Sequence, residues 1–258
     1  MTSVGRSLRT GVLLALLAGC APGGATPSPS SAATSAPEVL PSPTTNTPDA
    51  RLTCGGPRTF PPSALEAPVG AEKQAGPEFD ALRAALARFG PAFMGSSGLT
   101  WQLAQRDATG AIFLARAGVV DDGPGWISIE VENGPAGWQP SSLGQCTPLV
   151  VLSSEFGPAT WALDPAFPSP TGATTQLHVL VWERACSSGS PTTGRMSAPV
   201  VAVSAESVTI TIGVRPLGGN QTCPMPPGTP TVLALPEPLG HRVLLDGGRV
   251  PPASPSPP

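Results

Sequence analysis

Two histidines are the residues of this chain best suited to acid–base chemistry near neutral pH. His178 lies in the strand-like segment TTQLHVLVWE, and His241 follows the turn-forming segment PEPLG. Catalysis by an imidazole needs a neighbouring acid and a nucleophile, and the chain has no G-x-S-x-G nucleophile elbow to supply one. Structural roles are commoner for histidines in such contexts. The sequence therefore assigns no catalytic residue and favours binding over catalysis.

A second candidate for chemistry is the carboxylate pair Glu130 and Glu132, which alternates with Ile127, Ile129 and Val131. Two carboxylates on one strand face, set in a cleft, are the machinery of glycoside hydrolysis. A solvated strand face is the commoner outcome, and we favour it. Metal-binding motifs and phosphate-binding glycine motifs are missing, so the sequence predicts no metal and no cofactor.

Cysteines provide a third kind of chemistry. Cys54, Cys146, Cys186 and Cys223 form an even set, which in an exported chain predicts two disulfides. We favour Cys54–Cys146 and Cys186–Cys223 among the three pairings, because each then closes a separate block of sequence. A four-cysteine zinc site is the alternative, although no C-x-x-C pair is present.

The fifth cysteine, Cys20, ends the stretch LLALLAGC. Arg6, Arg9, a short apolar run and two small residues predict a signal peptide over residues 1–19. The apolar run is about half the length of ~20 residues that a spanning helix needs.

The segment Leu17 to Cys20 resembles the lipobox of bacterial lipoproteins, in which the cysteine thiol is acylated before cleavage. This resemblance implies acyl chains such as palmitate on Cys20, and a mature chain held by membrane lipid at the outer, extracytoplasmic face of the cell membrane. An ordinary secretory signal with an incidental cysteine is the alternative.

Composition divides the rest of the chain. Residues 20–50 combine the lipidated cysteine with a disordered linker of Ala, Pro, Ser and Thr, and residues 251–258 predict a disordered tail. Residues 51–250 form the globular domain, with halves expected at 51–144 and 145–250. The net charge of −3 gives no basic footprint for nucleic acid.

Periodicity predicts a mainly β (α+β) fold with antiparallel, sandwich-like sheets and one amphipathic helix near the start of the domain. The helix begins at Pro77 and stops at Gly90–Pro91. In ESVTITIGVR, apolar and polar residues alternate, so we expect this strand to cover a core on one side. The segment VVAVSAES precedes it and is expected to pair with it in a hairpin. The strands are expected at 101–105, 111–117, 127–132, 176–183, 199–203, 207–215, 231–235 and 242–245.

Five tryptophans stand out in a chain without tyrosine. Exposed indoles stack on sugars, and Trp126 and Trp138 are the candidates for stacking on a ligand such as a wall glycan. Core packing is the commoner role for tryptophan, and we favour it for Trp182 in particular.

The second half contains VWERACSSG, GRMSAPVV, SVTITIGVRP and the closing stretch Leu235 to Gly247. These segments resemble a family of uncharacterised exported proteins and lipoproteins of GC-rich Gram-positive and related bacteria. The resemblance supports two disulfides and implies no activity, so no catalytic residue is transferred.

Together these features predict a lipid-anchored cell-envelope protein whose domain binds a protein, a wall glycan or a small ligand. An extracytoplasmic hydrolase is the alternative, and it requires His178 or His241 to meet an acid and a serine in a cleft. A solute-binding protein is a further alternative, although the chain is short for two α/β lobes.

Overall fold

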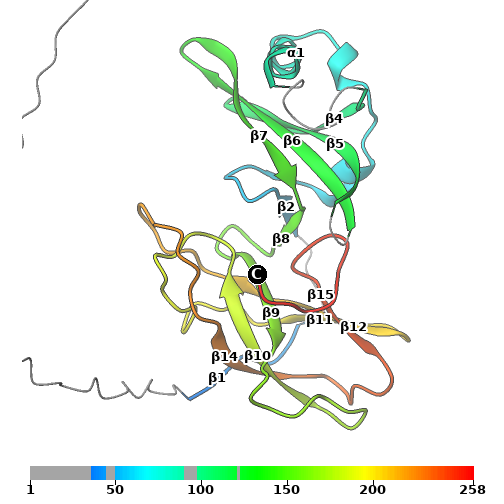
Figure 1. Ribbon diagram of the computed structural model, residues 1–258, viewed down its shortest axis with the longest axis vertical. Helices are drawn as coiled ribbons and strands as arrows, with labels where there is room; N and C mark the ends of the chain where they lie inside the picture. The colour runs from blue at the N-terminus through cyan, green and yellow to red at the C-terminus, as the bar shows by residue number, and fades with distance from the viewer. Residues whose placement is uncertain (1–35, 45–49, 90–97, 121–122) are drawn as a thin grey trace, which may run out of the picture. The chain divides into compact units, whose positions relative to one another are not determined.

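The computed structural model describes residues 36–44, 50–89, 98–120 and 123–258, and the side chains at 119–124 are excluded (Figure 1). The predicted signal peptide, Cys20 and most of the linker lie outside the described residues. The helices and strands belong to the unit Ser35–Pro258. No helix in the described part of the chain has the length and apolar character needed to cross a membrane.

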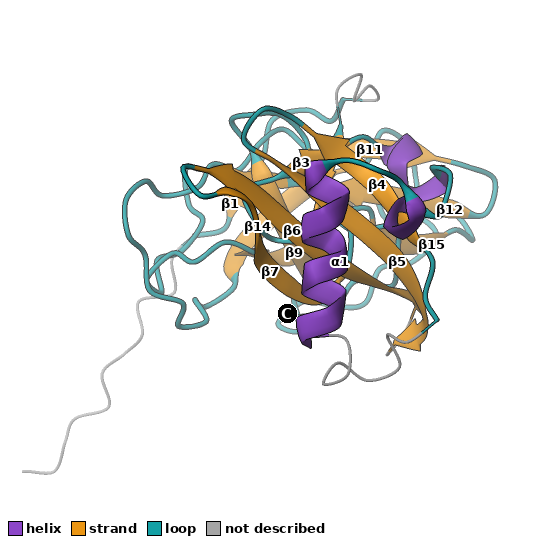
Figure 2. Cartoon of the chain, turned by 90° about the horizontal axis from the view of Figure 1, so that it is seen from above, coloured by secondary structure: helices purple, strands orange, loops and turns teal. Residues whose placement is uncertain are grey.

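A four-stranded antiparallel sheet with a helix on one face follows the first disulfide cysteine. Its strands run in the order β4 (Trp101–Arg106), β5 (Gly110–Val120), β6 (Gly123–Gly134) and β7 (Gly137–Cys146). Figure 2 shows α1 (Pro77–Phe89) lying across this sheet. The predicted helix is confirmed, and its apolar stripe packs on the sheet through a core that includes Phe79, Leu82, Ala85, Phe113, Ile127 and Ile129.

The opposite face of this sheet is also covered, which corrects the predicted solvated face. A small sheet of β3 (Thr59–Phe60), β2 (Arg51–Thr53) and β8 (Leu149–Val151) contributes to its cover, together with the 3-10 turn η1 (Pro62–Glu66). A second turn, η2 (Ala71–Lys73), precedes α1. Their shared core contains Leu52, Phe60, Ala64, Ile112, Leu114 and Trp126. The alternation predicted the sheet but not the segment that covers it.

A five-stranded sheet combines four strands of the second half with one strand from the N-terminal part of the chain. Its order is β1 (Glu38–Val39), β14 (Thr229–Ala234), β10 (Gln176–Glu183), β9 (Gly157–Leu163) and β13 (Gly213–Val214). Only the β1–β14 pair among these is parallel. Side chains of β10 alternate between the core, as Val179 and Val181 do, and the opposite face that carries His178.

A three-stranded sheet of β11 (Val200–Val203), β12 (Ser207–Thr211) and β15 (Val243–Asp246) shares a core with the five-stranded sheet. The predicted β11–β12 hairpin is confirmed. The strand predicted at 207–215 is divided at Ile212, so its two parts join different sheets. The shared core includes Trp161, Leu177, Val179, Val181, Val208, Ile210, Ile212 and Leu233, which gives the sandwich-like arrangement.

Both predicted disulfides are present. Cys54 pairs with Cys146 at a Cα–Cα distance of 4.9 Å, and Cys186 pairs with Cys223 at 4.5 Å. Cys146 is buried, whereas Cys186 and Cys223 are both exposed. Each disulfide closes a separate block of the sequence, and Cys186–Cys223 is the one whose two cysteines are both exposed.

The linker at residues 20–50 and the tail at residues 251–258 were both predicted to be disordered, but each contains residues that pair with the domain. In the linker, β1 pairs with β14, Leu40 is buried in the core, and Thr44 pairs with Val200. In the tail, Ala253 pairs with Asp246 through two backbone hydrogen bonds. Proline-rich composition misled the prediction because a few residues between prolines, such as Glu38–Leu40, are enough to complete a sheet edge.

Candidate functional site

The two tryptophans predicted to stack on a ligand have their rings covered from within the chain. Trp126 is only 4% exposed, and the Arg116 guanidinium carbon lies 5.2 Å from its ring centre. Trp138 is half-buried, with the Arg106 guanidinium carbon 5.9 Å from its ring centre. Glu78 holds Arg106 at 2.8 Å. Cation–π contacts within the chain therefore occupy these rings, and burial corrects the prediction for Trp126.

The three other tryptophans belong to the interior. Trp101 and Trp161 are fully buried, and Trp182 is 7% exposed. The indole N–H of Trp161 donates to the Ile210 carbonyl at 3.1 Å, so even its polar atom has a partner. Trp161 belongs to the core shared by the five-stranded and three-stranded sheets, and Trp101 belongs to the core between α1 and the four-stranded sheet.

The carboxylates Glu130 and Glu132 do not share a cleft. Glu130 is 8% exposed, beneath the loop that carries Gly56 and Arg58. The Arg58 guanidinium Nε lies 3.9 Å from a Glu130 oxygen and its Nη1 lies 3.2 Å from an oxygen of Asp107. Burial raises the pKa of Glu130, although Arg58 opposes the shift. Glu132 is exposed. The pair thus consists of one covered and one solvated carboxylate.

His241 is exposed in the turn after Leu239, and its side chain forms no hydrogen bond within the part of the chain that the structure describes. Within the described ranges, no group of three His, Cys, Asp or Glu side chains is placed to hold a metal ion.

His178 instead lies at a cavity of about 330 Å³, which we call the loop cavity, beneath the connection between β9 and β10. This connection spans residues 164–175 and is held at both ends. Asp164 N–H donates to the His178 carbonyl at 2.9 Å, and Leu239 N–H donates to the Thr174 carbonyl at 2.9 Å. Ordered loops of this length commonly carry function.

One wall of the loop cavity is an aromatic stack. The Phe167 ring lies 3.7 Å from the His178 ring, nearly parallel to it, and Phe167 is 40% exposed. His178 Nδ1 is buried without a hydrogen-bond partner among the described atoms. A buried imidazole nitrogen of this kind costs free energy until a partner reaches it. The remaining lining consists of Leu163, Asp164, Pro165, Pro168, Ser169, Pro170, Thr171, Thr174, Gln176 and Leu177.

The hydrolase alternative requires a histidine, an acid and a serine together, and the loop cavity contains His178, Asp164 and Ser169. They are not joined as a proton relay. The Asp164 carboxylate accepts a hydrogen bond from Ala166 N–H at 2.9 Å, and His178 Nδ1 has no partner. A relay needs the acid to orient the imidazole and the imidazole to reach the hydroxyl, so this arrangement favours binding.

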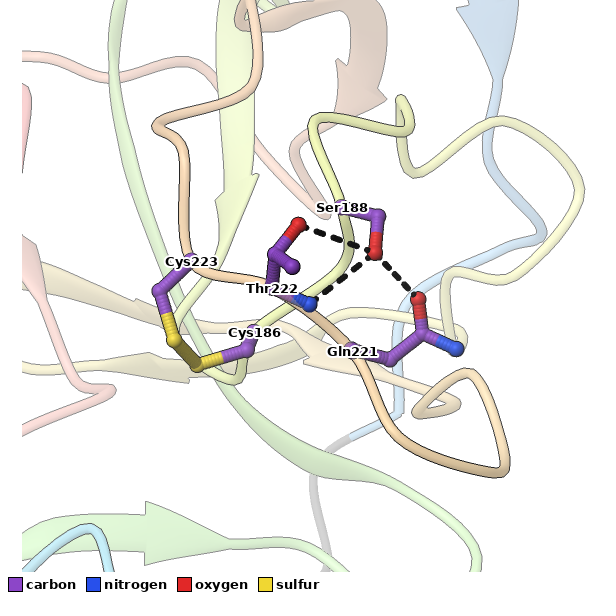
Figure 3. Close-up of a disulfide and its surroundings, with 5 residues drawn as sticks. All are labelled: Cys186, Ser188, Gln221, Thr222 and Cys223. Atoms are coloured by element: carbon purple, nitrogen blue, oxygen red, sulfur yellow. Dashed lines mark hydrogen bonds between the residues drawn. A yellow bond between two sulfur atoms is a disulfide. The ribbon is translucent and has the colours of Figure 1, made fainter.

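A second cavity, of about 200 Å³, lies beside the Cys186–Cys223 disulfide and is lined by Pro224, Met225 and Pro226. Figure 3 shows how the two loops at this disulfide are fastened. The Ser188 hydroxyl accepts a hydrogen bond from Thr222 N–H at 3.0 Å and donates to Gln221 Oε1 at 2.8 Å. Ser188 adopts a left-handed φ of 51°, which these bonds hold in place.

A third cavity, of about 130 Å³, lies where the C-terminal segment crosses the sheet edge. Asp246 lines this cavity, and its carboxylate accepts hydrogen bonds from Gly248 N–H and the Thr160 hydroxyl, each at 2.8 Å. Burial raises the pKa of Asp246, and these hydrogen bonds oppose the shift. Arg184, Arg249, Ser254 and Ser256 also line this cavity. We call it the tail groove.

Of the residues singled out from the sequence, His178 lines the loop cavity, whereas His241, the carboxylate pair Glu130 and Glu132, and the tryptophans Trp126 and Trp138 line none of the three cavities described above. The loop cavity had one sequence signal, the run DPAFPSPTGATT, in which an aromatic residue is set among prolines between two strands. Comparison of the chain with protein-family models, with curated proteins and with solved structures found no match. The resemblance to exported lipoproteins therefore stays a prediction, and function is inferred from the chemistry of this chain alone.

Proposed function

We propose that this chain is a lipid-anchored cell-envelope protein whose domain binds an uncharged, hydroxyl-rich ligand, namely a saccharide of the cell wall. The anchor would be acyl chains on Cys20, in agreement with the LAGC segment and the preceding signal-like run. Two disulfides support an oxidising, extracytoplasmic compartment, where such bonds persist.

The loop cavity is the observation that carries the binding proposal. Its volume of about 330 Å³ lies within the ~300–1,000 Å³ typical of small-molecule sites. The loop above it is fastened by hydrogen bonds to β10 and to the 239–240 turn, so the site is largely formed before a ligand arrives.

The lining defines the ligand class. Phe167 and three prolines offer flat apolar surfaces, and Ser169, Thr171, Thr174 and Gln176 offer neutral hydrogen-bonding groups. Neither lysine nor arginine lines this cavity, so phosphate and carboxylate ligands would find no counter-ion. A sugar ring suits this combination, because its apolar face packs on rings while its hydroxyls exchange hydrogen bonds with the neutral polar groups of the lining.

The anchor is tested by metabolic labelling with a palmitate analogue in a bacterial host that processes lipoproteins. The chain should incorporate the label and sediment with membranes, and Cys20→Ala should lose both properties. Cys186→Ser/Cys223→Ser is the control, since it also removes cysteines but leaves Cys20. Membrane attachment of the Cys20→Ala variant would contradict the anchor.

The ligand is tested by saturation-transfer NMR and calorimetry with N-acetylglucosamine oligomers and soluble wall fragments. Binding should weaken at least tenfold in Phe167→Ala and in Gln176→Ala. Met225→Ala, another exposed apolar side chain outside this cavity, serves as the matched control. Equal binding by all three variants, or no saccharide binding by the folded parent, would overturn the saccharide proposal and leave the anchor proposal unaffected.

A further inference from the structure

The Cys186–Cys223 disulfide lies in an open position between two loops of the second half. Cys186 follows β10 in the loop that leads to β11, and Cys223 lies in the loop between β13 and β14. Both of these cysteines are exposed, whereas Cys146 of the other disulfide is 3% exposed. Thiol–disulfide exchange requires a thiolate to reach a disulfide sulfur, so the two disulfides differ in the access that this reaction needs.

Both exposed cysteines also line the cavity of about 200 Å³ beside the disulfide. Pro224, Met225 and Pro226 directly follow Cys223 and belong to the same lining, and Met225 is 67% exposed. An exposed methionine between prolines offers an adaptable apolar surface to a second polypeptide. A small reductant uses little of this surface, whereas a protein that carries the attacking thiol can pack against it.

Arg184 lines the same cavity, two residues before Cys186, and is exposed. The Glu183 carboxylate, which belongs to the lining as well, is paired with Arg195 at 2.7 Å. A guanidinium near a cysteine stabilises its thiolate, and a more stable thiolate leaves a disulfide faster. Cys186 is therefore suited to leave as the thiolate, and the other cysteine is suited to be attacked.

Hydrogen bonds beside the disulfide also join the two loops, in addition to the sulfur–sulfur bond (Figure 3). Ser188 N–H donates to the Thr222 carbonyl at 2.9 Å, and Thr222 N–H donates to the Ser188 hydroxyl at 3.0 Å. The same hydroxyl donates to Gln221 Oε1 at 2.8 Å. Because none of these bonds involves a sulfur atom, they can hold the two thiols close together after reduction, which favours re-formation of the same disulfide.

We propose that the Cys186–Cys223 disulfide is a redox-active site that undergoes reversible thiol–disulfide exchange with a protein dithiol. One thiolate of the dithiol forms a bond to Cys223 Sγ as the Cys186–Cys223 bond breaks, and Cys186 leaves as a thiolate. The second thiolate of the partner then attacks its own sulfur in the mixed disulfide, which releases Cys223 and leaves the partner as a disulfide. Two electrons and the two thiol protons of the partner pass to Cys186 and Cys223. The oxidised partner restores the bond by the reverse steps.

This inference concerns a surface separate from the loop cavity, and it depends neither on saccharide binding nor on acylation of Cys20. Trapping of the mixed disulfide tests it. The full chain with Cys20→Ala, which removes the remaining thiol, is mixed with reduced thioredoxin whose second active-site cysteine is replaced by serine. Mass spectrometry without reductant should find one thioredoxin linked to Cys223, with Cys54 and Cys146 still joined.

Rates of reduction test the role of the surface around the disulfide. Unaltered reduced thioredoxin should reduce Cys186–Cys223 at least tenfold faster than dithiothreitol at the same concentration, while the circular dichroism of the domain stays unchanged. Arg184→Gln and Met225→Ala should each slow the reaction with thioredoxin at least threefold, whereas Arg88→Gln on α1 should leave it unchanged.

Re-formation of the bond tests the hydrogen bonds between the loops. Ser188→Ala should slow oxidation of the reduced chain by oxidised thioredoxin at least threefold, because it removes the hydroxyl that joins the loops. Ser190→Ala, in the same loop, is the matched control and should leave that rate unchanged.

Three results would overturn the proposal: no mixed disulfide with the folded chain, reduction by thioredoxin no faster than by dithiothreitol, or reduction of Cys54–Cys146 at the same rate with loss of the folded circular dichroism. If a variant at Arg184 or Met225 does not fold, the comparison of thioredoxin with dithiothreitol on the parent still decides the proposal.

Discussion

At the scale of the residue, one buried ion pair of this domain has specific partners that account for its place. Glu183 is almost fully buried, and its carboxylate lies 2.7 Å from Arg195, which also donates to the carbonyls of Arg215 and Pro191. A buried ion pair with additional hydrogen bonds fixes local geometry more than it adds stability. We therefore assign Glu183 and Arg195 a structural role, although one Glu183 oxygen, Oε1, shares with His178 Nδ1 the lack of a hydrogen-bond partner among the described residues.

Glu130 gives a pH-dependent prediction. Its burial raises its pKa above that of the unfolded chain, so ionisation of Glu130 opposes folding. The free-energy cost of ionising Glu130 in the folded domain is absent at low pH. It appears as the pH rises through the pKa of Glu130 in the unfolded chain and is complete above its pKa in the folded domain. Glu130→Gln removes it, while Arg58 keeps Asp107 as a partner. The variant should unfold at a higher temperature than the parent at about pH 7 and at the same temperature at about pH 3.

The control for Glu130 is Glu132→Gln, because Glu132 is exposed on the same strand. Its thermal unfolding should differ little from that of the parent at either pH. A stabilisation of Glu130→Gln that persists unchanged at acid pH would refute the electrostatic explanation.

A side chain introduced at Gly228 should clash with its neighbours. A Cβ built there would lie 2.6 Å from a ring carbon of Trp182 and 2.9 Å from Leu180 Cβ. Gly228→Ala should therefore destabilise the domain by about 1–3 kcal/mol, as overpacking of a closed site does. Chemical denaturation of Gly144→Ala provides the comparison, because a Cβ at Gly144 meets nothing within 4 Å.

At the scale of the element, regular patterns were predictable and interrupted ones were not. The bounds of α1 and β10 follow from helical spacing, from capping by Gly and Pro, and from a continuous β-branched and aromatic run. Prediction missed β7 because GWQPSSLGQC lacks alternation, and it missed β9 because Pro158 and Gly157 open a short strand. Both strands depend on neighbouring strands rather than on their own pattern.

The candidate site was harder to predict than the fold. His178 was placed correctly on a strand face, but its cavity depends on a loop that folds back through hydrogen bonds to residues more than sixty positions away, at Leu239 and Gly240. No local pattern encodes such a contact. The even number of cysteines left three pairings open, and the favoured one, in which each disulfide closes a separate block of sequence, is the one present.

The two disulfides should differ in their response to reductant. Cys186 and Cys223 are exposed, whereas Cys146 is 3% exposed within a core. Under a mild dithiol at native conditions, alkylation and mass spectrometry should detect modified Cys186 and Cys223 well before Cys54 and Cys146, because exchange requires access to sulfur. Simultaneous modification of all four would mean that the domain unfolds before either bond is reduced.

At the scale of the whole molecule, residues 38–44 pair with strands formed by the second half of the chain. Leu40 is 7% exposed in the shared core, Glu38 accepts a hydrogen bond from Gly194 N–H at 2.9 Å, and Thr44 pairs with Val200 of β11. The globular domain therefore begins before residue 51, inside the predicted linker.

Removal of the linker should accordingly have two different effects. Deletion of residues 21–34 should leave thermal unfolding of the domain nearly unchanged, whereas deletion of residues 21–44 should lower stability, because it removes β1 and Leu40. Leu40→Ala alone should cost about 2–5 kcal/mol, as truncation of a buried leucine does. Equal unfolding temperatures for the two deletions would show that β1 contributes nothing to the fold.

The incorporation of β1 into the sheet also sets a limit on where the domain can operate. If Cys20 is acylated as proposed, residues 21–35 form the tether between the lipid and the first residues that the structure describes. Fifteen residues, even fully stretched, extend roughly 50 Å. The domain then stays within about 50 Å of the membrane surface, and any wall polymer that it binds must extend to within that distance of the membrane.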